Sequence, residues 1–250
     1  MRLKFSQYFI DTSDDFNHTG KARYKIHYAA VPYTYKGFPF EANYEMHYED
    51  KRNVIQINFQ ATTGNMDWIA NFLFTKKYYD SFEWKGKKIT LKVHNGWAAM
   101  YKAMKKQIRD RVNVLMHVYP TAEIEIVGWS LGSGMAQLCA QDIFYNFGRK
   151  VFLYTYGSVN PWKTNIFNRR KIKKYLRECC YECYNFTNVN DIVTYLPPRL
   201  FGFIKIKRRP VGRPFIFWKL FNPGKYHTTY DNEKLYIKYY SQKKWRWPHG

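Results

Sequence analysis

The chain has 250 residues, of which 46% are hydrophobic and 24% charged, and its formal net charge at pH 7 is +22. This length and apolar content predict one globular domain over residues 1–250 and exclude a largely disordered chain. No run of about 18 uncharged apolar residues occurs, which excludes a membrane-spanning helix of the usual kind.

The N-terminal segment, MRLKFSQYFIDTSDDF, has only one short apolar patch. A secretory signal peptide would need a longer apolar region and a cleavage site of small residues. We therefore expect a cytoplasmic protein, or one released without a cleavable signal peptide, that is peripheral at membranes when active.

The positive charge is concentrated toward the C-terminus. From Lys163 onward there are 20 Lys and Arg against 5 Asp and Glu, so 15 of the 22 net charges lie there, including the basic portion 199–250. The densest runs are NRRKIKKYLR (168–177) and KIKRRPVGR (205–213). Such a surface attracts nucleic acid or anionic lipid. A solvated face in a lysine-rich chain explains the same charge equally well.

The first elements along the chain are predicted strands at 24–31, 43–50 and 53–60, which are rich in β-branched and aromatic residues. A helix is predicted over 97–119, because apolar residues recur there at spacings of three and four and Pro120 follows.

Strands and helices then alternate. We expect a strand at 124–129, a helix at about 131–147, and strands at 151–157 and 184–190. This order predicts a mostly parallel sheet with helices on both faces, an α/β fold. In such sheets the reactive groups follow the carboxyl ends of the strands.

The most informative junction is VGWSLG, where a strand gives way to a helix. Gly128, Ser130 and Gly132 fit the G-x-S-x-G pattern of a sharp elbow that exposes a nucleophilic serine. The N-terminus of the helix that follows would favour a developing oxyanion. A glycine-rich turn with an incidental serine is the simpler alternative.

A serine nucleophile needs a base and an orienting carboxylate, and in elbow enzymes these follow in the order acid, then histidine. Only His227 and the penultimate His249 lie beyond Ser130, and chain ends fray, so His227 is the predicted base. Asp191 directly follows a strand and is the predicted acid, with Glu182 a distant second choice.

A second oxyanion donor is also required. The backbone N–H of Leu131 would supply one donor, and Thr62, in the turn Gln60–Gly64 after a strand, could supply another. On spacing alone, an ordinary turn explains residues 60–64 at least as well.

The four cysteines are Cys139, Cys179, Cys180 and Cys183, three of them within ECCYEC. A zinc site would need further ligands at suitable spacing. We therefore predict reduced structural thiols, no metal and no cofactor.

Several blocks, taken together, resemble the class 3 (fungal-type) lipases of the α/β-hydrolase fold. They are INFQATTGNMDWIANF (57–72), VHNGWAAMY (93–101), VGWSLGSGMAQL (127–138), YGSVNPWKTNIF (156–167), NVNDIVTYLPP (188–198) and YHTTY (226–230). The resemblance covers roughly residues 53–230.

The resemblance implies Ser130 as nucleophile, Asp191 as acid and His227 as base, with Thr62 and Leu131 as oxyanion donors. It further implies a short amphipathic lid over about Gly64–Phe74. The apolar side chains of that lid would contact substrate, and Trp129, where the family usually has histidine, would line the pocket; the lid residues named are Met66, Trp68, Ile69 and Phe72. Gln60 and Ala61 replace the family's usual Arg and Gly, which makes the oxyanion geometry less secure.

Two functions follow. The first is a serine hydrolase of lipid esters, either a triacylglycerol lipase or a phospholipase A, that uses an anionic lipid surface. The second is a polyanion- or membrane-binding protein on a catalytically silent scaffold. No nucleic-acid motif favours nucleic acid as the partner, and the sequence does not indicate an oligomeric state.

Overall fold

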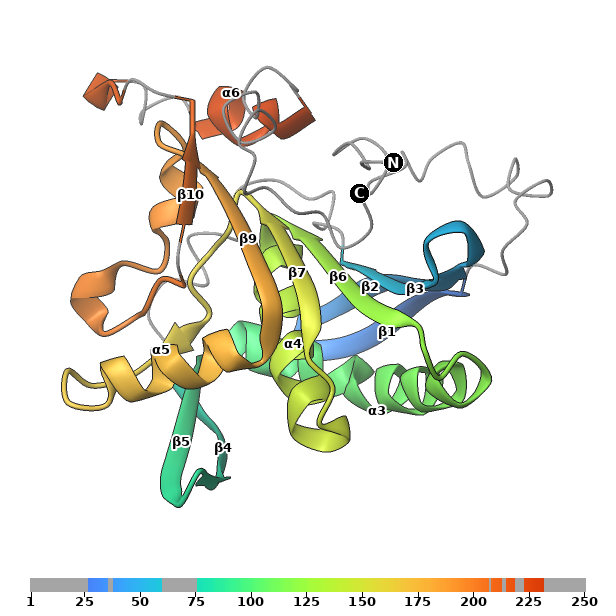
Figure 1. Ribbon diagram of the computed structural model, residues 1–250. Helices are drawn as coiled ribbons and strands as arrows, with labels where there is room; N and C mark the ends of the chain where they lie inside the picture. The colour runs from blue at the N-terminus through green and yellow to red at the C-terminus, as the bar shows by residue number, and fades with distance from the viewer. Residues whose placement is uncertain are drawn as a thin grey trace, which may run out of the picture.

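A computed structural model of the chain describes residues 27–35, 38–59, 76–206, 208–212, 215–218 and 223–231. Within these ranges a seven-stranded sheet has the order β1-β2-β3-β6-β7-β9-β10 (Figure 1). Its strands are β1 (His27–Tyr35), β2 (Phe38–Glu49), β3 (Val54–Phe59), β6 (Glu123–Trp129), β7 (Val151–Tyr156), β9 (Cys180–Asn188) and β10 (Arg208–Val211).

The first three strands are antiparallel neighbours, whereas β3, β6, β7, β9 and β10 run parallel to one another. The mostly parallel sheet expected from the alternating elements is therefore confirmed. It places the carboxyl ends of β6, β7 and β9 side by side at one edge.

The described helices are α3 (Asn95–Val118), α4 (Leu131–Phe147), α5 (Arg169–Glu178) and the short α6 (Pro223–His227). Four 3-10 helices accompany them: η2 (Asp50–Arg52), η3 (Ile192–Tyr195), η4 (Arg199–Phe201) and η6 (Thr229–Asp231). The helices predicted at 97–119 and 131–147 are confirmed to within two residues. None of the helices in the described ranges is long and apolar enough to cross a membrane.

One face of the sheet meets α3 and α4. Ile57, Ile126 and Leu153 share this face with the stripe of α3 that carries Met104 and Ile108, and all five side chains are fully or almost fully buried. This apolar stripe is what the spacing of three and four in the sequence encodes. Burial of this shared core therefore holds α3 and α4 against one face of the sheet.

The opposite face is more polar and aromatic. Buried Glu125 on β6 pairs with Arg52 of η2, with Nη1 3.0 Å from Oε2. The rings of Tyr154 and Tyr184 stack on neighbouring strands, with centroids 5.2 Å apart. On this face, buried polar groups are stabilised by ion pairs and hydrogen bonds, and the aromatic rings by contacts with one another.

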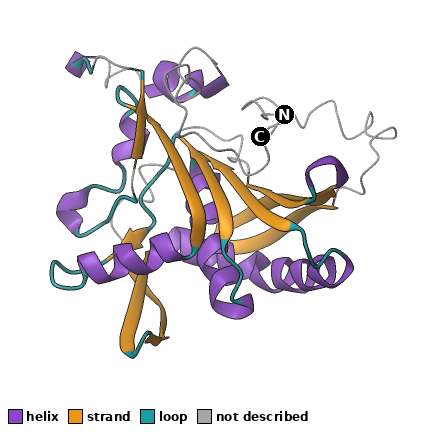
Figure 2. Cartoon of the chain, in the orientation of Figure 1, coloured by secondary structure: helices purple, strands orange, loops and turns teal. Residues whose placement is uncertain are grey.

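A second sheet was not predicted. It joins β4 (Lys76–Trp84), β5 (Lys87–His94) and β8 (Trp162–Lys163), and the β4–β5 hairpin projects below the main sheet in Figure 2. The alternation of apolar and charged residues in KKITLKVH encodes β5, which buries Ile89, Leu91 and Val93.

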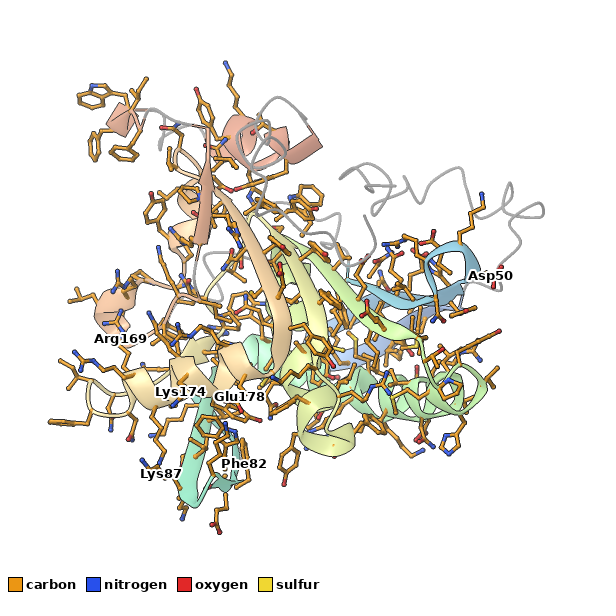
Figure 3. All side chains as sticks on the ribbon, in the orientation of Figure 1. Asp50, Phe82, Lys87, Arg169, Lys174 and Glu178 are labelled. Carbon is orange, nitrogen blue, oxygen red and sulfur yellow. The ribbon has the colours of Figure 1, made fainter. Side chains whose placement is uncertain are left out.

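The basic run 168–177 forms most of α5. Ile172, Tyr175 and Leu176 are buried, while the charged residues lie around the rest of the helix. Figure 3 shows Arg169 and Glu178 at its two ends, and Glu178 forms an ion pair with Lys85 of the hairpin. The run is therefore an amphipathic helix docked on the domain through its apolar stripe.

Candidate active site

Ser130 lies at the sharp turn between β6 and α4. Its backbone has φ 54° and ψ −122°, a conformation that costs a residue with a Cβ roughly 1–3 kcal/mol. The Ser130 N–H donates to the carbonyl of Tyr156, at 2.9 Å, which ties the turn to β7. A Cβ on Gly128 would lie 2.4 Å from the carbonyl oxygen of Gly132, so the elbow requires glycine there.

Gly134 has a different role from the one the sequence suggested. In the sequence, Gly134 and Ala136 continue the run of small residues after the elbow, which predicts that both let the helix pack close to the sheet. In the structure a Cβ on Gly134 would instead lie 2.3 Å from Nε1 of Trp97 on α3. Close contact with the sheet comes from Ala136, which faces Gly128. Trp97 Nε1 donates to the Leu131 carbonyl at 3.0 Å, so α3 braces the first turn of α4.

The structure brings together Ser130, His227 and Asp191, the three side chains that the sequence predicts as nucleophile, base and acid. His227 Nε2 is 2.6 Å from Ser130 Oγ, and His227 Nδ1 is 2.8 Å from Asp191 Oδ2. Because a carboxylate only accepts, Nδ1 carries the proton and Nε2 is left to accept from the serine hydroxyl. The side chains are almost fully buried, with exposed fractions of 2% for Ser130, 0% for Asp191 and 6% for His227.

Asp191 is held by both of its carboxylate oxygens. Oδ1 accepts from the backbone N–H of Val193 at 2.9 Å, in the N-cap arrangement of η3. Oδ2 accepts from the hydroxyl of Tyr230 at 2.8 Å as well as from His227. The Tyr230 hydroxyl in turn accepts from the N–H of Asn188.

Tyr230 was missed from the sequence, because only carboxylates and histidines were considered for the acid and base. Its position three residues after His227, in YHTTY, was the available signal. His227 ends α6 and Tyr230 lies in η6 (Thr229–Asp231), with one residue between the two elements, and both side chains reach Oδ2 of Asp191.

Two neighbours fix the plane of the His227 ring. The indole of Trp129 stacks against it at 5.8 Å between centroids, with an interplanar angle of 23°. On another side lies Gly157, at φ +56°, where a Cβ would be 2.9 Å from His227 Cε1. The bulky residue beside the nucleophile thus lines the site, as the resemblance implied, and it does so by packing on the imidazole.

Leu131 begins α4, where backbone N–H groups have no acceptor within the helix. Its N–H is therefore available to an oxyanion bound at Ser130. Thr62 and the expected lid residues Met66, Trp68, Ile69 and Phe72 lie outside the described residues.

The alternative acids lie elsewhere. Asp142, within α4, accepts a bidentate pair from Arg109 of α3, at 2.6 and 2.9 Å. Glu182 is on β9, and partial burial raises the pKa of its carboxyl. His249 lies outside the described residues.

The cysteines are free thiols, and those at 139, 179 and 180 are buried. Burial raises the pKa of Cys179 to about 12, which makes this thiol a poor nucleophile at neutral pH. Within the ranges that the structure describes, no three His, Cys, Asp or Glu side chains gather as a metal site.

Comparison with known families gives a match to one sequence model, described as Lipase (class 3), over residues 56–201. Among curated proteins, a lipase of Rhizomucor miehei is 27% identical over 159 residues, which cover 62% of this chain and 40% of that protein. Phospholipase A1-Ialpha2 of Arabidopsis thaliana, a chloroplastic protein, is 28% identical over 170 residues, covering 60% of this chain and 34% of its own length.

Solved structures show the same fold. Rhizomucor miehei triacylglyceride lipase superposes with a TM-score of 0.61 at 22% identity, over 76% of this chain and 67% of that one. A triacylglycerol lipase whose catalytic centre is a serine-protease triad superposes with a TM-score of 0.58 at 23% identity, over 74% of this chain and 67% of that one. The chain thus spans well under half the length of the curated relatives it matches, but most of it shares their fold.

Proposed function

The chain belongs to the class 3 lipase family, which adopts the α/β-hydrolase fold, and from that premise we propose that it hydrolyses lipid esters through Ser130, His227 and Asp191. One observation carries the proposal: a single imidazole bridges the Ser130 hydroxyl and the Asp191 carboxylate, with both contacts at 2.6–2.8 Å. This is the hydrogen-bond chain that nucleophilic serine catalysis requires.

In the first half of the reaction, Ser130 Oγ attacks the ester carbonyl while its proton passes to His227 Nε2. The carbonyl becomes an oxyanion, which the Leu131 N–H stabilises at the N-terminus of α4. The tetrahedral intermediate collapses as His227 gives its proton to the leaving alcohol. An acyl ester on Ser130 remains.

In the second half, water replaces the alcohol. His227 takes a proton from the water, the hydroxide attacks the acyl carbonyl, and the carboxylic acid leaves as Ser130 Oγ recovers its proton. Throughout, Asp191 stabilises the imidazolium and keeps Nδ1 protonated. Tyr230 donates to the same carboxylate oxygen as His227, and the Val193 N–H donates to the other, so both hold Asp191 in place.

Lipid esters are the substrate class that the relatives support, since they include a lipase and a phospholipase A1. We propose that the basic part of the chain brings the enzyme to anionic lipid, where it works as a peripheral protein. Both triacylglycerol and phospholipid hydrolysis are consistent with the site, because Ser130 attacks the same acyl carbonyl in each.

The test is the substitution Ser130→Ala. We expect loss of p-nitrophenyl ester hydrolysis and of fluorophosphonate labelling, because no other group replaces the nucleophile. Ser81→Ala, on the β4–β5 hairpin, is the matched control and should keep both signals. A Ser130→Ala protein that is still labelled or active contradicts the proposal.

The chain-length profile of p-nitrophenyl esters, with and without anionic vesicles, then separates substrate classes. Activation by vesicles would support both lipid docking and the lid expected at 64–74. If the wild-type chain is neither labelled nor active but binds polyanions in a salt-sensitive way, the silent-scaffold alternative is correct.

A further inference from the structure

A basic pocket of about 480 Å³ lies between α5, the η3–η4 segment and β10. Its lining includes none of Ser130, Asp191 and His227, although Arg208 lies close enough to Asp191 to interact with its charge. The polar residues that line the basic pocket are Lys173, Arg177, Tyr195, Arg199, Lys205 and Arg208.

Among the residues that the structure describes, no carboxylate lines this pocket, and none of its five cationic side chains forms an ion pair with an acidic residue. Nη2 of Arg208 is buried and has no hydrogen-bond partner in the described part of the chain. A buried guanidinium nitrogen without an acceptor is costly. Arg177 Nε donates to the backbone carbonyl of Lys173, at 3.2 Å, but Nη2 of Arg208 has no such partner among the described residues, so the pocket has a donor available to an anion.

Aromatic packing holds two of the cations, Lys205 and Arg208, against the ring of Tyr195. Lys205 Nζ lies 4.1 Å from the centroid of the Tyr195 ring, and Arg208 Cζ lies 5.0 Å from the same ring. Burial lowers the pKa of Lys173, and the charges of Arg169 and Arg199 lower it further, so α5 and η4 bring like charges together. Several cations around one cavity create a strong positive electrostatic potential inside it, which attracts an anion.

Phosphate esters suit this pocket better than carboxylates or sulfates. A phosphate monoester carries a charge of about −1.5 to −2 and three acceptor oxygens, so two such groups would offset most of the charge of five cations. Arginine forks bind phosphate oxygens two at a time, and a pocket of this volume holds a compact headgroup.

Exposed apolar side chains gather beside the pocket. The segments 163–164 and 202–203 run antiparallel, since the Thr164 N–H donates to the Gly202 carbonyl at 3.0 Å and Lys163 bridges to Phe203. This pairing brings the residues just beyond it to one place. Continued by two or three residues, the same register places 166–167 opposite 199–201. We call the exposed apolar side chains there the apolar tip: Ile166, Phe167, Leu200 and Phe201, exposed by 78%, 89%, 89% and 43%.

Large apolar side chains at such exposure, next to a basic pocket, are the combination that peripheral proteins use at membrane interfaces. Apolar side chains enter the acyl boundary while cations meet the headgroups. Leu200 and Phe201 directly follow the pocket residue Arg199 along the chain, so both parts would meet a bilayer together.

We propose that the basic pocket binds the headgroup of a membrane lipid that carries phosphate monoesters, while the apolar tip inserts beside it. This inference rests on the proposed function in naming a lipid surface, but the site is separate from Ser130. It gives the enzyme a specific point of attachment, in addition to the diffuse attraction of a positive chain for negative lipid.

The test measures binding of the full chain to vesicles by co-sedimentation, with Ser130→Ala protein included so that hydrolysis does not alter the lipid. Two vesicle types carry the same total negative charge on a phosphatidylcholine background. One contains a phosphatidylinositol bisphosphate and the other phosphatidylserine. We expect about tenfold tighter binding to the phosphomonoester vesicles.

Two variants locate the site. Lys173→Gln/Arg177→Gln should abolish most of this preference, whereas Lys87→Gln/Lys88→Gln, with the same charge change on the β4–β5 hairpin, should keep it (Lys87 is labelled in Figure 3). Phe167→Ser/Leu200→Ser should weaken vesicle binding and leave binding of soluble inositol phosphate unchanged. Circular dichroism checks that each variant is folded.

Equal affinity for the two vesicle types, or equal losses in the two charge variants, would refute the site. Soluble inositol phosphate that binds as tightly as the vesicles, with no effect of the apolar substitutions, would mean a soluble phosphate ligand and overturn the lipid assignment. Esterase activity on a short soluble ester is measured alongside. Loss of that activity alone contradicts the proposed function, whereas loss of headgroup preference alone contradicts this inference.

Discussion

The triad and the basic pocket are two polar regions built on opposite principles. At the triad, both oxygens of Asp191 and both ring nitrogens of His227 have protein partners at 2.6–2.9 Å. In the basic pocket, five cations converge, and within the described part of the chain no carboxylate lines it and one buried nitrogen of Arg208 has no partner.

The difference shows which region is complete without a ligand. The triad is preorganised, because every group that must be held is held before substrate arrives. The basic pocket is electrostatically strained until an anion enters, so its function is to bind. Three experiments can break or sharpen this contrast.

The largest effect is expected from Gly157→Ala, which tests how tightly the triad is positioned. The new Cβ would lie 2.9 Å from His227 Cε1 and 3.1 Å from Tyr230 Cε2. A shift of about 1 Å in a catalytic group costs about 100-fold, so we expect that loss in kcat.

Gly148→Ala is the matched control for that substitution. Gly148 has φ +64°, close to the +56° of Gly157, but nothing lies within 4 Å of its Cβ position. Both variants therefore place a Cβ at a positive φ, but only Gly157→Ala also brings it against His227. Thermal unfolding measures the stability that each variant loses. If both lose activity equally, contact with His227 is not the cause.

Tyr230→Phe should have a smaller effect. It removes one hydrogen bond to Asp191 and leaves the N–H of Asn188 without its acceptor, at about 1–3 kcal/mol of stability. We expect about a tenfold fall in kcat with KM unchanged, because Tyr230 positions the acid and does not touch substrate. Steady-state kinetics and urea unfolding measure the two effects, and a change in KM alone would rule out the positioning role.

The smallest effect concerns the pH dependence of headgroup binding. Burial, and then the charges of Arg208 and Arg199, lower the pKa of Lys205 to about 7. An anion binds the protonated form better, so affinity for phosphomonoester vesicles should fall as pH rises through 7. One basic residue near anionic lipid contributes roughly 1 kcal/mol, so we expect about a fivefold change between pH 6 and 8.5.

The phosphate itself titrates near pH 6 and gains charge as pH rises, which acts in the opposite direction. Lys205→Met isolates this contribution and should remove the fall in affinity. The other groups that face Lys205 are cations or a phenol and come from every element around the pocket: Lys173, Arg177, Tyr195, Arg199 and Arg208. An unchanged pH profile in Lys205→Met would show that another group is responsible.

Much of the catalytic end was predictable from the sequence because its signals are local. The elbow glycines, the strand before Ser130 and the helix after it lie within a few residues of one another. Asp191 and His227 followed from chain order combined with the rule that reactive groups sit at strand ends. These three side chains do meet in the structure.

The rest depends on contacts between distant segments. The basic pocket joins residues from 173 to 208, and the pairing of 163–164 with 202–203 that exposes the apolar tip leaves no periodic signal. Gly134 was assigned to the wrong neighbour for the same reason, since the packing of Trp97 against it depends on how two helices cross. Charge density marked the basic region, but only the fold showed where its cations converge.

The strained backbone of Ser130 bears on why a serine is kept at this position. At φ 54° and ψ −122° glycine would be the more stable residue, so the serine lowers the stability of the fold at the position where its hydroxyl meets His227. A protein that only bound lipid would gain stability by replacing it. The elbow is thus less stable with serine than with glycine, and this loss of stability is balanced only in a chain that uses the serine hydroxyl.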